Sequence, residues 1–101
     1  MKVLGKPIIE KFGRKHANAR GALTAWVEDV ELATWKTPHD IKRRYSSASF
    51  LSDNVVIFNI RGNQFRLEVR VAYVAGIVRI LEVNTHADYD EKNKTRKSRG
   101  N

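Results

Sequence analysis

The second half of the chain contains three apolar stretches that predict β-strands. Residues 55–60 are almost wholly apolar, which is typical of a strand covered on both faces. Residues 65–73 alternate between apolar and polar positions, and residues 77–83 form a third apolar stretch. Successive strand residues point to opposite faces, so the second strand presents one apolar face. Its other face would carry Arg66, Glu68 and Arg70.

The first half of the chain predicts helices. Apolar residues recur at spacings of 4, 3, 4 and 3 between Ala19 and Ala33, which marks one face of a helix. Pro7 suits the first turn of an earlier helix, and residues 37–40 (Thr-Pro-His-Asp) read as the capped start of a later one. Residues 1–4 could form a short strand, whereas residues 46–49 are expected to be a connector.

The order of these elements predicts the fold class. Helices come first and an antiparallel meander follows, because the short connections between the three strands require hairpins. We therefore expect an α+β fold, with two to three N-terminal helices packed on one face of a small antiparallel β-sheet and the other face open. Residues 1–90 would form a single domain. Residues 91–101 are basic, contain no large apolar residue and are expected to be disordered alone.

The charge of the chain narrows the range of partners. The 101 residues carry a net charge of +8, and most of the excess lies before residue 90. A net positive charge of this size favours binding to polyanions such as nucleic acid, an acidic protein or an anionic membrane. The alternative is that the charge serves only solubility. The chain has no cysteine and no apolar run of the ~18 residues that span a bilayer. Its first residues lack the apolar core of a signal peptide, so we expect a cytoplasmic protein that does not enter membranes.

Several enzyme classes find no support in the sequence. His16, His39 and His86 lie in different predicted elements without the spacing of metal ligands, and Gly62 lies in a hairpin rather than in a phosphate-binding loop. No nucleophile elbow is present. We therefore expect neither a metal nor a cofactor. The sequence gives little support to a function as a dehydrogenase, kinase or serine hydrolase.

The remaining polar residues suit phosphodiester chemistry on RNA. Cleavage without a metal uses the 2′-OH of the RNA as nucleophile, so the protein must move protons and stabilise charge on the phosphate. Arg66 can pair with phosphate oxygens, His86 can act as acid or base, and Tyr89 can stack on a base or transfer a proton. The alternative is structural: Arg66 would pair with Glu68 or Glu82, and the other two would be surface or capping residues.

Further basic and polar residues could contact RNA. The run 42–44 (Lys-Arg-Arg) is either a solvated helix face or a patch that contacts phosphates. The predicted RNA-binding residues are Lys36, Arg43, Arg61, Asn63 and Arg70.

Four segments of the chain resemble the HigB toxin family of the RelE superfamily, which are bacterial mRNA interferases. They are residues 35–42 (WKTPHDIK), 47–54 (SASFLSDN), 56–67 (VIFNIRGNQFRL) and 85–90 (THADYD). Their order and spacing together are specific, and the resemblance covers nearly the whole chain.

This resemblance implies a RelE-like fold and endonucleolytic cleavage of mRNA, commonly in the A site of the 30S ribosomal subunit. It also implies neutralisation by a HigA-type antitoxin that carries a helix-turn-helix. The positions that match the family site are Arg66, His86 and Tyr89, with Lys36, Arg61 and Asn63 as further candidates.

Two other functions remain open from the residues alone. The first is a non-catalytic RNA-binding module that uses the same basic face. The second is an interaction protein whose charge matches an acidic partner.

Overall fold

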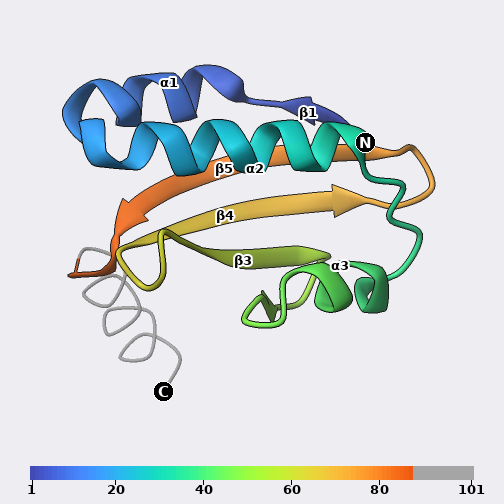
Figure 1. The fold of residues 1–101 in the computed structure, drawn as a ribbon. Coiled ribbons are helices and arrows are strands. Elements are labelled where there is room, and N and C mark those ends of the chain that lie inside the picture. The colour runs from blue at the N-terminus through green and yellow to red at the C-terminus, as the bar shows by residue number, and fades with distance from the viewer. Residues whose placement is uncertain (88–101) are drawn as a thin grey trace.

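A computed structural model describes residues 1–87 of the chain (Figure 1). Helices pack on one face of a five-stranded sheet in this part of the molecule. In chain order the elements are β1 (Lys2–Leu4), α1 (Lys6–Lys15), the 3-10 helix η1 (Ala17–Ala19), α2 (Arg20–Leu32), α3 (Pro38–Arg44), β2 (Ser49–Phe50), β3 (Val55–Ile60), β4 (Phe65–Ala72) and β5 (Ile77–Thr85).

The sheet confirms the predicted α+β fold class and the antiparallel meander of three strands. Its strand order is β1-β5-β4-β3-β2, and β3, β4 and β5 pair antiparallel. β1 adds a parallel edge strand beside β5, with Val3 opposite Val78, so the sheet is mixed. Gly5 allows α1 to begin directly after this strand: its φ is +91°, and a Cβ there would lie 2.8 Å from the carbonyl oxygen of Ile80.

The predicted helix face packs against the sheet. Ala19, Leu23, Trp26 and Val30 are all buried, which confirms the spacing that marked them. At the next helix, the hydroxyl of Thr37 accepts from the backbone N–H of Asp40 in a capping box, as its sequence predicted. The carboxylate of Asp40 also accepts a hydrogen bond from the backbone N–H of Lys36. This bond lowers the pKa of Asp40.

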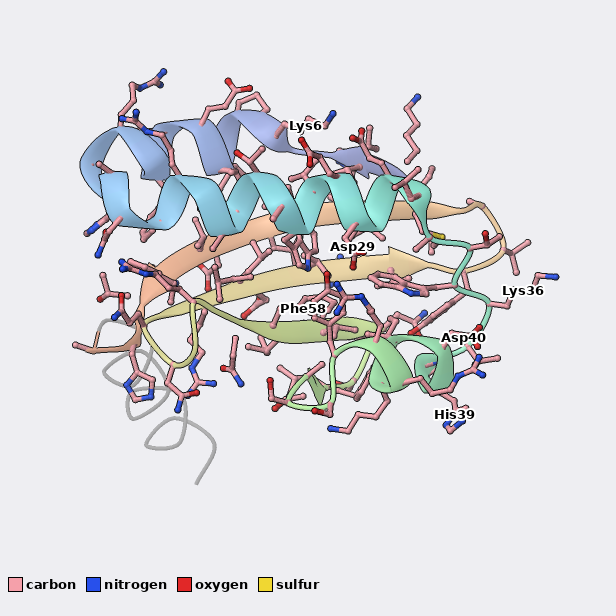
Figure 2. All side chains as sticks on the ribbon, in the orientation of Figure 1. Lys6, Asp29, Lys36, His39, Asp40 and Phe58 are labelled. Carbon is pink, nitrogen blue, oxygen red and sulfur yellow. The ribbon has the colours of Figure 1, made fainter. Side chains whose placement is uncertain are left out.

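Phe58 lies at the centre of an aromatic cluster on the helix-covered face (Figure 2). Its ring centroid lies 5.3 Å from that of Trp26 in α2, 6.1 Å from that of Trp35 and 5.1 Å from that of Tyr45. These three rings come from α2, from the segment after it and from the residue after α3. The cluster therefore holds α2 and α3 on the same side of β3.

The helices α1, α2 and α3 all lie on one side of the sheet, and we call the opposite face the open face (Figure 1). It contains the alternate residues of β3, β4 and β5, which include Arg66, Glu68 and Arg70 as predicted. Val55 and Ile57 also lie on this face, where both are buried but separate from the main core. Their burial explains why β3 reads as apolar on both faces.

The strand boundaries differ from the sequence prediction in three places. A two-residue strand, β2, begins at the last residue of the expected connector, because Ser49 and Phe50 pair with Ile57 and Val56. β4 ends one residue earlier than predicted, whereas β5 continues through Thr85. The longer β5 brings Asn84 into the sheet beside β4, which matters for the site.

Candidate functional site

Arg66 lies in a polar row that crosses the open face. It is the second residue of β4, and the register places Asn59 of β3 on one side of it and Asn84 of β5 on the other. The half-buried Arg66 guanidinium donates a hydrogen bond to Oδ1 of Asn59. An amide is a neutral partner, so this contact orients the guanidinium and itself adds no opposite charge.

Asn59 is itself held in position. Its Nδ2 donates to the carbonyl oxygen of Ser47 at 3.3 Å, which leaves its Oδ1 as the acceptor for Arg66. Sequence reasoning missed Asn59 and Asn84. The signal for Asn59 was a single amide in an otherwise apolar strand, but its contact with Arg66 requires knowledge of the strand register.

His86 lies at the same end of the sheet as Arg66. It directly follows β5, two residues beyond Asn84, and its side chain is half-buried. Its backbone N–H donates to the carbonyl oxygen of Gln64 at 2.9 Å, in the loop that joins β3 to β4. The structure therefore brings His86 to the strand end where Arg66 lies.

Arg61 and Asn63 lie in the same loop, at this end of the sheet. Arg61 has a φ of +53°, and its Nη1 donates to the carbonyl oxygen of Asn18 at 3.3 Å and to Oε1 of Gln64 at 3.4 Å. These contacts turn Arg61 toward η1 and the helix layer. Asn63 is exposed.

Arg70 lies on the open face with Arg66, farther along β4. Arg70 is the fourth residue after Arg66, which places it roughly 13 Å away along an extended strand. Arg70 lies directly opposite Arg79 of β5, a residue that sequence reasoning did not single out.

Lys36 and Arg43 lie away from this group. Lys36 follows α2 and borders a hollow with Tyr73 and Val74, at the β4–β5 turn and thus at the opposite end of the strands. Figure 2 places Lys36 beside the α3 end that carries Asp40. Arg43 forms an ion pair with Asp40 at 2.7 Å, on α3 and hence on the helix-covered side. The structure does not bring these two predicted RNA-binding residues to the open face near Arg66.

Tyr89, the third predicted catalytic residue, lies outside the described residues, as does the basic segment 91–101. Within residues 1–87 no group of three or more His, Cys, Asp and Glu side chains is placed to hold a metal ion. The same part of the chain has no helix long and apolar enough to cross a membrane.

The arrangement combines an oriented cation with an acid–base group. The Arg66 guanidinium has the geometry to recognise an anion over the open face, and the imidazole of His86 can act as an acid or a base. Arg70 and Arg79 add positive charge farther along the strands, beyond the row that holds Glu68 and Glu82.

The sequence matches the model of a known protein family. A family model described as HigB_toxin, the RelE-like toxic component of a toxin–antitoxin system, matches residues 19–92. The matched segment includes every predicted site residue. A search of curated proteins finds no significant match.

Proposed function

Because this chain belongs to the HigB family of RelE-like toxins, we propose that it is an mRNA interferase that cleaves mRNA on the ribosome without a metal ion. The main support for this proposal is the polar row on the open face. In this row Asn59 orients Arg66, and His86 lies just after β5 at the same end of the sheet. The family membership makes the chain the toxin of a toxin–antitoxin pair. Its antitoxin would be of the HigA type, with a helix-turn-helix, and both would act in the cytoplasm.

The reaction would use the RNA as its own nucleophile. The 2′-OH loses its proton to a base and attacks the adjacent phosphorus, and the bond to the 5′-oxygen of the next nucleotide breaks. That oxygen takes up a proton, which leaves a 2′,3′-cyclic phosphate on one fragment and a 5′-hydroxyl on the other. The atoms and protons balance without water or a metal ion.

Each residue has a role that follows from its position. Arg66 would donate to the nonbridging phosphate oxygens, where negative charge grows in the transition state. His86 would serve as the general base or the general acid. The sequence prediction assigns Tyr89 the second proton transfer or stacking on a base, and Arg61 and Asn63 would contact RNA beside the site.

The decisive experiment compares two arginine variants in cells. We expect expression of the parent chain to stop growth and to create new mRNA ends, and Arg66→Ala to relieve both effects. Loss of one charge-stabilising donor should lower the cleavage rate about 10²–10³-fold. Arg14→Ala, an exposed arginine on α1, is the matched control and should remain toxic. Full toxicity of a folded Arg66→Ala protein would contradict the assignment.

The product ends test the reaction route separately. Cyclic 2′,3′-phosphate ends support attack by the 2′-OH, whereas 3′-hydroxyl ends contradict it. A non-catalytic RNA-binding module is the competing function, and it would produce growth arrest without new mRNA ends.

A further inference from the structure

Arg70 and Arg79 form a pair of like charges directly opposite each other on the open face. The register of β4 and β5 places them side by side, and both side chains are exposed. Side chains of directly opposed residues in an antiparallel sheet start about 5 Å apart, and like charges at this distance are destabilising. Such a pair has no structural benefit of its own.

The neighbours of the pair do not neutralise it. Val55 flanks Arg70 in β3, and Leu4 flanks Arg79 in β1, so the row across the sheet holds no carboxylate. Within residues 1–87 neither guanidinium forms an ion pair. The nearest acids on this face, Glu68 and Glu82, lie in the next row toward Arg66.

One guanidinium of the pair is already oriented. The Nε of Arg70 donates to the carbonyl oxygen of Asp53 at 3.3 Å. Asp53 and Asn54 both have φ near +60°, so the turn before β3 is tightly folded at this point. Since Nε is used by the protein, the two terminal nitrogens of Arg70 remain to bind an anion, and Arg79 makes no hydrogen bond within the described chain that would compete.

From this arrangement we propose that Arg70 and Arg79 together hold a second RNA phosphate, separate from the one at Arg66. Two opposed guanidinium groups can donate to one phosphate from both sides, and the bound anion removes their mutual repulsion. The roughly 13 Å between Arg66 and Arg70 is too long for one phosphate and fits two phosphates of the same strand. The RNA therefore runs along β4, from the cleavage site at Arg66 toward the β4–β5 turn.

This inference rests on the proposed function for its ligand, but its test does not require cleavage. The probe is a fluorescein-labelled RNA of about ten nucleotides with 2′-O-methyl riboses, which lack the nucleophilic hydroxyl. Its affinity for the full chain is measured by fluorescence anisotropy over a salt series. We expect Arg79→Ala to weaken binding about tenfold at low salt and to reduce the salt slope by about 0.7, the value for one phosphate on a single strand.

Two comparisons make the test specific. Arg14→Ala removes the same charge from the helix side and should keep the parental slope. Arg79→Lys keeps the charge but not the planar fork, and it should bind between the parent and Arg79→Ala.

The double variant Arg70→Ala/Arg79→Ala tests whether the two residues share a phosphate. It should lose little more affinity than either single variant. If the two single losses of affinity add in the double variant, and its salt slope changes twice as much, the two residues do not share a phosphate. Parental RNA binding by Arg79→Ala would also contradict the proposal, as would a parent chain that does not bind the probe.

A stability measurement separates this inference from misfolding. Because Arg79→Ala relieves repulsion between like charges, its melting temperature should equal or exceed that of the parent. The outcome is also distinct from that of the proposed function. If the pair binds phosphate but no new mRNA ends form in cells, only the proposed ribonuclease activity is contradicted. If mRNA is cleaved but Arg79→Ala leaves the salt slope unchanged, only the second phosphate site is contradicted.

Discussion

Phe58 and Asn59 are neighbours in β3, but they belong to opposite faces of the sheet. Phe58 is buried among three aromatic rings that hold α2 and α3 on the sheet. Asn59 is half-buried, and its contacts are hydrogen bonds with Ser47 and Arg66. One strand thus supplies the stability of the fold with one set of residues and positions the candidate site with the alternate set.

This separation has a practical consequence for mutations. Substitutions on the helix-covered face should change stability, whereas substitutions at the polar positions around Arg66 on the open face should change activity. The two faces can therefore be tested independently, and any residue that affects both would break the division.

His86 offers the largest expected effect on the activity side. We expect His86→Gln to lower single-turnover cleavage of ribosome-bound mRNA about 10²–10⁴-fold, because the variant cannot transfer a proton. Binding of the 2′-O-methyl RNA and the melting temperature should stay close to the parental values, since the backbone N–H that bonds to Gln64 remains. Cleavage at the parental rate would make His86 a structural residue.

Phe58→Ala tests the other side of the comparison. Removing the central ring of the cluster should lower the free energy of unfolding by about 3–5 kcal/mol, measured by urea denaturation. Asn59→Ala is the matched variant one residue along the same strand and should cost only about 1 kcal/mol. If the two variants lost equal stability, the division of labour between the two faces would be wrong.

Tyr45 offers a smaller effect, at the border of the covered face. Its hydroxyl donates to Oδ2 of Asp29, which also pairs with Nε of Arg44 at 3.2 Å. Burial and then the Asp29 contact raise the pKa of Tyr45 in the folded state. The Tyr45 hydroxyl therefore stabilises the fold fully below the pKa of tyrosine in the unfolded chain, about 10. This stabilisation is lost as the pH rises through the higher pKa of Tyr45 in the folded state.

The variant Tyr45→Phe isolates this contribution. It should lower the free energy of unfolding by about 1 kcal/mol at neutral pH, because one hydrogen bond is lost. It should also lose less stability than the parent between neutral pH and about pH 11. Parallel curves of stability against pH for the two proteins would contradict a role for this phenol.

The sequence predicted the elements whose signal is local. The alternation over residues 65–73 identified both faces of β4, and the spacing from Ala19 identified the buried side of α2. Thr37 and Asp40 identified the start of α3, because a capping box depends on residues only three positions apart.

Contacts between distant segments could not be predicted in the same way. β1 and β2 have only three and two residues, too few for a periodic pattern, and each exists because a longer strand pairs with it. Likewise, Arg66 was identified as a site residue, but its contact with Asn59 depends on the register of two strands. Lys36 lies in a connection, and nothing in its local sequence determines which end of the sheet it approaches.

The pairing of β1 with β5 also governs when the molecule can become complete. Lys2 lies opposite Ile77, so the first strand waits for a partner that is synthesised 75 residues later. Contacts of such long sequence separation form late, because the chain between them must be ordered first. Asn84 reaches Arg66 through the same last strand. While β5 is still inside the ribosome, a nascent chain would therefore have neither the β1–β5 pairing nor the full row around Arg66. The appearance of the site is thus tied to the synthesis of β5.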